Sequence, residues 1–397
     1  MEAKNLRRLS KMDSLKSYEL LHMAKDLARA ATEVQDTLEN SFLREQIVEV
    51  VEGFYDIGKV RDAFEIFGGY VNRSFKVIVE KDGREKEYFV RKYKLEITEN
   101  EIRFEHAMVA HALDNGFQLL AAVVNTAHAD TFVSPEISRN KFAIYTFLQG
   151  EDKYTWDNPL MLDSEYASAA EVLASFHSAA RDFRPGPFSR AEPGILELVG
   201  GLDRSFTQYS RLNRSTKFHD FLTGNLDRIL SAVQANTISS GDADGMIRIP
   251  IHCDYHPGNM KFSEGKVVGI FDFDWAKIDL RLFDVCLALA YNSVHWGGRQ
   301  DGIMLLEKCA IFLKSYQYTL QSLGALAPLS DAELSSFPTM MAMANFFLLN
   351  WDITAYYTGS EKNDYEYLAY LKHNVRQMEW IESHKQGFAE VADSVRI

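Results

Sequence analysis

The chain has little cysteine, no surplus of positive charge and no long apolar run. Of its 397 residues only three are cysteine, Cys253, Cys286 and Cys309, and no pair has the spacing of metal ligands. This scarcity argues against a disulfide framework and fits a reducing compartment, so we expect a cytoplasmic protein. The formal net charge of −13 argues against a nucleic-acid partner, because general nucleic-acid-binding proteins carry a basic face.

A membrane partner is not expected either. No stretch approaches the run of about 20 apolar residues that a membrane span requires. The first residues, MEAKNLRRLSKMDSLKSYELL, are basic but contain no apolar core, so they do not resemble a signal peptide. Hydrophobic residues make up 46% and charged residues 25%, a mix typical of a globular protein. The length suits one large domain or two lobes that share a core.

The character of the sequence changes twice along the chain. Residues 1–50 lack Gly and Pro and are rich in Leu, Ala, Glu and Lys, which predicts a helical extension and a candidate arm for a homodimer. Residues 51–149 contain short β-type runs interrupted by one helix, and residues 150–397 are mostly helical in pattern. We therefore expect an α+β fold in which a small β-rich N-terminal lobe precedes a larger α-rich lobe.

The densest group of reactive side chains lies in residues 251–276, IHCDYHPGNMKFSEGKVVGIFDFDWA. Two short apolar strands joined by Ser-Glu-Gly-Lys predict a β-hairpin within it. Since a hairpin brings its ends together, Asn259 and Asp272 should lie side by side and offer oxygen ligands to Mg²⁺. Asp254, on the loop that enters the hairpin, should be close enough to accept a proton from an attacking hydroxyl.

These groups are the set that phosphoryl transfer requires. The run from His252 to Asn259 resembles the HxDxxxxN motif of the aminoglycoside phosphotransferase and choline kinase superfamily, and Asp272 follows at 272 − 259 = 13 residues, as in protein kinases. The resemblance implies a bilobal protein-kinase-like fold that binds ATP and Mg²⁺ and phosphorylates the hydroxyl of a small molecule. It assigns catalysis to Asp254 with His252, and metal binding to Asn259, Asp272 and Asp274.

Three other interpretations of this segment remain. The alternating His252, Asp254 and His256 suit a metallohydrolase, but no further His/Asp cluster completes such a site. Residues 271–274 resemble the DxD strand of a haloacid-dehalogenase-type phosphatase, yet the residues after them and their late position do not fit. A hairpin with incidental acids would bury several polar side chains without purpose, which is costly.

The β-rich lobe is expected to bind the nucleotide. Gly68 and Gly69 lie in a turn whose backbone can approach phosphates closely. Residues 55–77 are similar to the start of type II homoserine-kinase-like proteins, where an Asn follows the glycines, and Asn72 matches it. A plain hairpin turn is the alternative for the glycines.

The strand YFVRKY, residues 88–93, should carry the cation that holds the α- and β-phosphates. Successive strand residues face opposite sides, so only one of Arg91 and Lys92 can point at the nucleotide. The resemblance places Arg91 where the family usually has Lys. It also matches Glu105 to the helix glutamate that pairs with this cation, with Glu101 as the fallback.

Two further residues match the superfamily as supporting groups. His177, in the segment LASFH, is expected to be structural. Asp284 is expected to begin the next helix as its cap and to anchor the loop that supports the active site.

The acceptor is defined less sharply. The similarity of residues 55–77 favours homoserine or another amino alcohol, and aminoglycosides, choline, ethanolamine and sugars are alternatives within the superfamily. Trp351, Asp352 and Tyr356, in NFFLLNWDITAYY, are candidates to hold a cationic acceptor, although we favour a buried aromatic helix for this segment. A non-catalytic pseudokinase that binds a nucleotide or a partner is the alternative from another class.

Overall fold

The computed structural model describes residues 43–66, 72–136, 138–212, 214–359 and 363–397. Gly68 and Gly69 therefore lie outside the described residues. So does the extension expected over residues 1–50, except for its last eight residues, 43–50, which belong to a helical stretch over 43–54. The homodimer arm stays a prediction.

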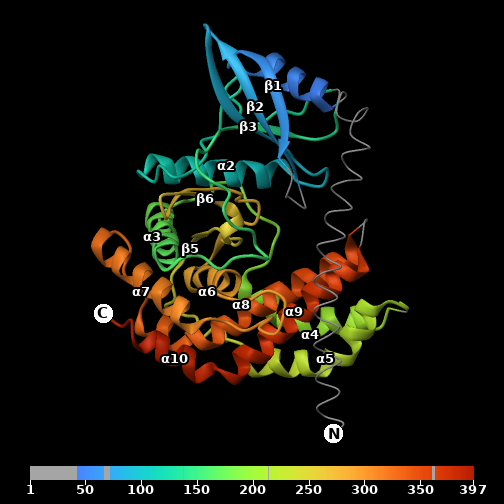
Figure 1. The fold of residues 1–397 in the computed structure, drawn as a ribbon, viewed down its shortest axis with the longest axis vertical. Coiled ribbons are helices and arrows are strands. Elements are labelled where there is room, and N and C mark those ends of the chain that lie inside the picture. The colour runs from blue at the N-terminus through green and yellow to red at the C-terminus, as the bar shows by residue number, and fades with distance from the viewer. Residues whose placement is uncertain (1–42, 67–71, 137, 213, 360–362) are drawn as a thin grey trace.

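A four-stranded antiparallel sheet forms the small lobe (Figure 1). Its strands lie in chain order: β1 (Lys59–Ile66), β2 (Arg73–Lys81), β3 (Arg84–Lys92) and β4 (Phe142–Thr146). Alternate residues of β2, namely Phe75, Val77 and Val79, pack with Ile47 and Val50 of the 43–54 helix. The period-two pattern thus buries one face of the sheet against this helix.

The opposite face of the sheet packs toward α2 (Glu99–Asp114). Thr98 caps this helix, and Glu101 closes a capping box by accepting the Thr98 backbone N–H at 2.9 Å. The helix ends at Asp114, and Gly116 follows with a φ of 88°, the left-handed conformation that glycine adopts most readily. Glu101 is therefore used in the cap, which leaves Glu105 as the helix glutamate that can face the sheet.

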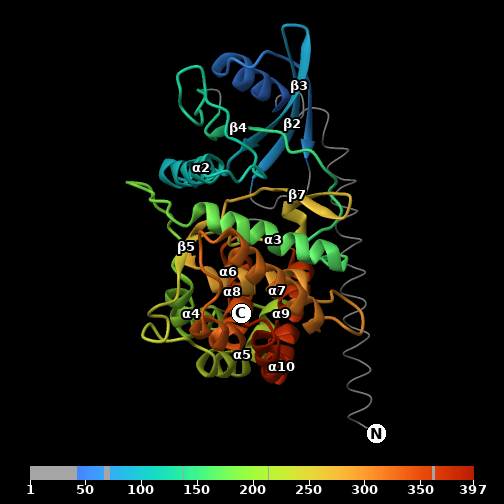
Figure 2. The same ribbon diagram turned by 90° about the vertical axis from the view of Figure 1, so that its left-hand side faces the viewer.

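The large lobe is mostly helical, and Figure 2 shows the small lobe above it, with α3 and β7 at the top of the large lobe. Two short antiparallel pairs interrupt the helices: β5 (Arg248–Ile251) with β8 (Lys277–Leu280), and β6 (Met260–Ser263) with β7 (Lys266–Ile270). Its helices are α3 (Asp163–Ala180), α4 (Ile195–Ser210), α5 (Lys217–Ala235), α6 (Arg281–Asn292), α7 (Leu306–Leu323), α8 (Asp331–Thr358), α9 (Asp364–Ser383) and α10 (Lys385–Asp393).

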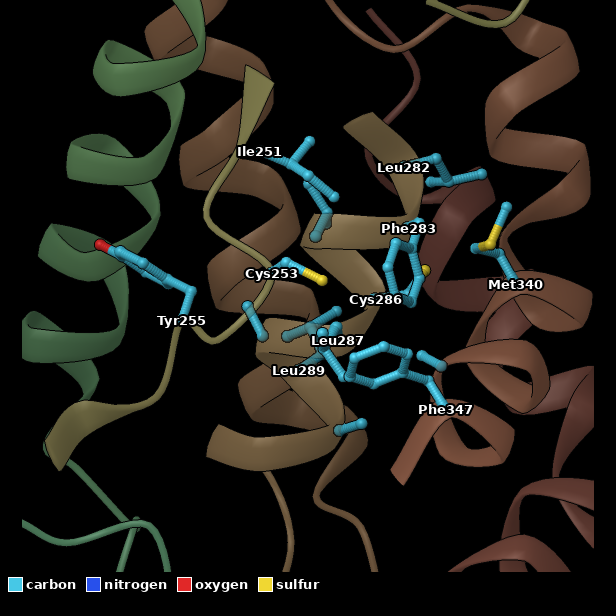
Figure 3. Close-up of a cluster of buried hydrophobic side chains, with 14 of the residues drawn as sticks. Ile251, Cys253, Tyr255, Leu282, Phe283, Cys286, Leu287, Leu289, Met340 and Phe347 are labelled. Atoms are coloured by element: carbon cyan, nitrogen blue, oxygen red, sulfur yellow. The ribbon is translucent and has the colours of Figure 1, made fainter. Parts of the chain in front are cut away.

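Helix α6 is the centre of the core of this lobe (Figure 3). On one side its apolar residues meet Ile251 and Cys253, at the end of β5. On the other side Phe283 packs edge-to-face on Phe347 of α8 at 5.4 Å between ring centroids. The loop after β5 consequently rests on a close-packed support, which holds its polar residues in fixed positions.

The fold has the mixed α+β, two-lobed form that the sequence predicted. Within the stretches that the structure describes, no helix combines the length and apolar character needed to cross a membrane.

Candidate active site

The loop that carries Asp254 is fastened to α6 by one buried carboxylate. Asp284 accepts the backbone N–H groups of His252 at 2.9 Å and Cys253 at 2.7 Å. Cys253 has a φ of 61°, a strained conformation for a non-glycine residue that the surroundings must hold. Asp284 thus anchors the loop, but it does not cap the helix, whose N-cap residue is Leu280. The Nε2 atom of His177 lies 3.0 Å from the same carboxylate, a structural position.

His252 ties this loop to the segment before Asp272. Its Nε2 lies 3.0 Å from the carbonyl oxygen of Phe271, and a carbonyl only accepts, so Nε2 carries the hydrogen. Burial lowers the pKa of His252, which keeps the ring neutral at neutral pH. The side chain is fully buried, and its bond to Phe271 fixes the position of the loop relative to Asp272.

Asp254 lies beside Asn259 and is ionised at neutral pH. The Asn259 Nδ2 donates to the Asp254 backbone oxygen at 2.9 Å and to its Oδ2 at 3.0 Å. Burial alone would raise the pKa of Asp254, but His256, whose Nε2 is 3.6 Å away, and a hydrogen bond with Tyr291 keep it below its ordinary value. A carboxylate in this state can accept a proton.

The hairpin brings its two ends together. The backbone N–H of Phe271 donates to the carbonyl oxygen of Asn259 at 3.1 Å, directly before Asp272. Asp272 has a φ of 67°, which turns it out of the strand direction. Since the Asn259 amide nitrogen is held by Asp254, its oxygen is directed elsewhere and is available to a cation.

Arg91 is buried among three carboxylates. Its Nη1 is 2.5 Å from Asp274 and 3.4 Å from Glu105, and its Nη2 is 3.2 Å from Asp272. Lys92 faces the other side of the sheet, where its Nζ donates to Gln46 at 3.1 Å. Strand alternation therefore directs one of the two cations to the site and the other to the 43–54 helix.

A buried polar network holds Glu105 behind Arg91. The hydroxyl of Tyr145 donates to Glu105 at 3.1 Å and lies 2.7 Å from the hydroxyl of Tyr93. His106 completes the group at 2.9 Å from the Tyr145 hydroxyl. Burial raises the pKa of Glu105 to about 7, and Arg91 opposes this rise by favouring the charged form.

Asn72 and Asp274 connect the two lobes directly. The Asn72 side-chain amide donates to Asp274, and its oxygen accepts the backbone N–H of Lys94 at 3.0 Å. Burial raises the pKa of Asp274 to about 6, again against the effect of Arg91. The residue expected to contact nucleotide from the small lobe thus meets one of the expected metal ligands.

The donor chemistry of this cleft fits a divalent metal ion. Asp272, Asp274 and Glu105 surround one guanidinium, so negative charge exceeds positive charge in a mostly buried place, and a cation would offset it. Over the described parts of the chain, no three His, Cys, Asp or Glu side chains are grouped to hold a metal alone. A metal there would rely on the Asn259 oxygen and on phosphate oxygens as well, as Mg²⁺ in kinase sites does.

The candidate acceptor residues of α8 contact buried aromatic and polar neighbours, and Trp351 and Tyr356 both pack on Tyr367. Asp352 is buried and accepts from the Asn374 Nδ2 at 2.7 Å, and burial raises the pKa of Asp352 well above its ordinary value. Tyr356 instead turns toward α5, stacking on Phe218 at 3.8 Å. Trp351 stacks on Tyr367 at 6.1 Å between centroids. The segment is a buried aromatic helix, as we favoured. Two of its residues reach toward the Asp254 loop: Asp352 adds to the effect of burial in raising the pKa of Tyr291, and Trp351 lies 6.3 Å from Tyr370 between ring centroids.

An aromatic group near the Asp254 loop was not foreseen. Trp156 meets Tyr370 at 4.9 Å and Trp296 at 5.0 Å, and Trp296 stacks on His373 at 3.5 Å. The backbone nitrogen of Trp156 lies 3.4 Å from the position that a Cβ atom on Gly258 would take. The aromatic group is therefore next to the loop that carries Asp254. These residues come from three distant segments, and no local pattern in the sequence connects them.

The chain is similar in sequence to known proteins. The model of the phosphotransferase enzyme family (APH) matches residues 64–315. A homoserine kinase of Ralstonia nicotianae is 26% identical over 299 residues, which cover 74% of this chain and 80% of that protein.

Solved structures agree on the fold. An aminoglycoside phosphotransferase of Alicyclobacillus acidocaldarius superposes with a TM-score of 0.59 at 16% identity, covering 87% of this chain and 96% of that one. A microcompartment-associated aminopropanol kinase gives the same TM-score of 0.59 at 16% identity, covering 86% and 96%. With the family model matching more than half of its length, this chain belongs to the phosphotransferase enzyme family.

Proposed function

We propose that this ATP-dependent small-molecule kinase phosphorylates the hydroxyl group of homoserine or of a closely related amino alcohol. The observation that carries the proposal is the ionised Asp254 beside Asn259, at the end of a hairpin whose other end leads to Asp272. The proposed base, metal ligands and phosphate-binding cation would then lie in one site, which is the arrangement phosphoryl transfer requires. The similarity to homoserine kinases supports the choice of acceptor.

In the proposed reaction Asp254 orients the acceptor hydroxyl and takes its proton. The hydroxyl oxygen forms a bond to the γ-phosphorus while the bond from that phosphorus to the bridging oxygen breaks, and ADP leaves. The low pKa of Asp254 keeps it unprotonated at neutral pH, so it can accept the proton as the new bond forms. His252 acts through position: its bond to Phe271 fixes the base relative to Asp272.

The nucleotide phosphates would be held from both lobes. Asn259 and Asp272, with Asp274 beside them, would bind Mg²⁺, which offsets charge on the phosphate oxygens when bound. Arg91 would contact phosphate: its Nε has no hydrogen-bond partner within the described chain. Glu105 would keep the guanidinium in place through their ion pair. Gly68, Gly69 and Asn72 remain proposed contacts on the nucleotide side.

The acceptor side is proposed around Asp254, Tyr291 and the aromatic group of Trp156, Trp296 and Tyr370. Aromatic faces suit the ammonium group of an amino alcohol. Asp352 would affect the acceptor indirectly, through its neighbours, because it is buried and accepts a hydrogen bond from Asn374. We keep Trp351 as a weaker candidate, and Tyr356 is occupied by Thr216 and Asp364 at 2.8 Å each.

The test is ATP consumption measured with a panel of acceptors. Homoserine, aminopropanol, ethanolamine, choline, an aminoglycoside and a hexose would be compared at equal concentration, with product identified by mass spectrometry. We expect kcat/KM to be highest for homoserine or another amino alcohol. Preference for the aminoglycoside or the sugar would overturn the acceptor assignment and leave the kinase assignment standing. Nucleotide binding with no acceptor-dependent turnover would instead favour a pseudokinase.

A further inference from the structure

An arginine on the connection between α3 and α4 reaches the candidate active site. Arg190 lies in residues 181–194, yet its side chain is only 6% exposed. Its Nη2 donates to the backbone carbonyl of Asp274, and its Nε lies 3.4 Å from Glu192. A buried guanidinium is costly unless its surroundings favour the charge, so its position calls for an explanation.

The charge of Arg190 acts on the carboxylates of the site. It lowers the pKa values of Asp274 and of Glu105, partly opposing the effect of burial on both. Arg91 alone faces three carboxylates, and Arg190 supplies a second positive charge beside them. Its Nη1 has no hydrogen-bond partner in the described part of the chain, so its contribution to the cleft is mainly the one bond to Asp274 and the charge.

Residues 181–194 are also hydrogen-bonded to both lobes. Toward the small lobe, Ser189 accepts from Asn100 in the first turn of α2 at 3.1 Å. Toward the large lobe, the carbonyl of Pro193 accepts from Lys277 at 2.7 Å, in the strand that follows Asp274. Residues 181–194 thus connect the helix that carries Glu105 with the segment that carries Asp274.

The backbone of Asp272 adopts a conformation that its neighbours must hold. Its backbone has a φ of 67°, and strained residues keep such a conformation only where neighbours hold them. His252 holds the segment on one side through Phe271, and Arg190 holds it on the other through the Asp274 carbonyl.

We propose that Arg190 is a positioning residue that holds the Asp272–Asp274 segment against α2, so that the metal and phosphate ligands of both lobes are assembled together. This rests on the proposed metal role of Asp272. Arg190 contacts no reacting atom, and its effect should fall on the metal-bound nucleotide and spare the acceptor.

The experiment compares Arg190→Ala, Arg190→Lys and the control Arg184→Ala. Arg184 belongs to the same connection, but it is exposed and donates to the Phe183 carbonyl. We expect Arg190→Ala to raise KM for MgATP by roughly tenfold, the effect of losing a hydrogen bond to a charged group, with acceptor KM within about twofold. Lys can restore the charge and one donor, so Arg190→Lys should recover part of the loss, and Arg184→Ala should match wild type.

Two measurements without turnover accompany the kinetics. Hydrogen exchange of the nucleotide-free protein should become faster over residues 271–277 in Arg190→Ala and stay unchanged in Arg184→Ala. Calorimetry should show weaker ADP binding in the presence of Mg²⁺, with a smaller change in EDTA. Unchanged exchange and unchanged MgADP affinity would overturn the proposal even if Asp272→Ala abolishes metal dependence. An equal loss in Arg190→Lys, or an equal rise in acceptor KM, would reduce Arg190 to general structural support.

Discussion

At the scale of single residues, the charge balance around Arg91 decides how the site works. One guanidinium is shared by Asp274, Glu105 and Asp272, two of which also belong to the proposed metal site. An arginine is always charged and presents several N–H groups in one plane, so it can contact a carboxylate and a phosphate at once. That property would let Arg91 serve where the resemblance in sequence leads us to expect lysine.

Arg91→Ala should therefore raise KM for ATP and lower kcat, because it removes the phosphate contact and leaves Glu105 buried without its partner. Lys92→Ala is the matched control, since Lys92 faces Gln46 on the other side of the sheet. We expect Lys92→Ala to stay close to wild type in steady-state kinetics. The reverse ranking would transfer the role to Lys92, and no effect from either would place the nucleotide elsewhere.

Several residues of the site could be predicted because they rest on local rules. The strand period separates Arg91 from Lys92, and the hairpin predicts that the ends of the strands at Asn259 and Phe271 meet, as they do. Arg190 could not be predicted, because it lies on a connection without regular structure and meets Asp274 only through the tertiary fold. The side chains that face the site from α8 could not be predicted for a related reason: the face of a helix that is apolar all round cannot be assigned from its pattern.

At the scale of elements, the β6–β7 hairpin and the loop before it act as one unit. Asp284 holds the start of the loop, His252 connects it to Phe271, and Asn259 lies against Asp254. Each contact joins backbone or buried groups, so a change in one should move the others.

Asp272→Ala tests the proposed metal site at the end of the β6–β7 hairpin. Removing the carboxylate should weaken nucleotide binding in the presence of Mg²⁺ and affect metal-free binding much less. Titration of ADP with and without Mg²⁺ separates the metal-dependent part of the affinity from the metal-independent part. If wild type and variant bind ADP equally under both conditions, Asp272 is no metal ligand.

The segment between α6 and α7 is fastened to α9 by another carboxylate. Asp301 accepts the Gly297 backbone N–H at 2.9 Å, lies 2.7 Å from His373 Nδ1 and pairs with Arg376. Burial would raise the pKa of Asp301, but His373 and Arg376 lower it to about 2. A carboxyl with a depressed folded-state pKa stabilises the fold above its unfolded pKa of about 4 and loses this effect as pH falls.

Asp301→Asn should consequently reduce the free energy of unfolding by on the order of 2 kcal/mol at neutral pH. The difference from wild type should stay constant down to about pH 5 and narrow between about pH 4 and pH 2. Urea denaturation at neutral pH and at about pH 3 measures it. Asp152→Asn, which removes an exposed carboxylate paired with Lys261, should change stability by less than about 1 kcal/mol. A difference in the free energy of unfolding between wild type and Asp301→Asn that does not change with pH would contradict this account.

At the scale of the whole molecule, the candidate site is built from both lobes. Arg91, Glu105 and Asn72 come from the small lobe, and Asp254, Asn259, Asp272 and Asp274 come from the large one. The order of β-rich and helix-rich parts could be read from the sequence because the period of its apolar residues changes along the chain. The packing between lobes could not, since it depends on contacts such as Asn72 with Asp274 across 202 residues of sequence.

The central claim is that Asp254 is the base of an ATP-dependent phosphotransferase acting on an amino alcohol. The most direct test measures acceptor phosphorylation by wild type and by Asp254→Asn, with homoserine as acceptor and ADP affinity as the check on folding. We predict that Asp254→Asn keeps its ADP affinity and loses turnover by a factor on the order of a hundred or more. Near-normal phosphorylation by this variant would contradict the account.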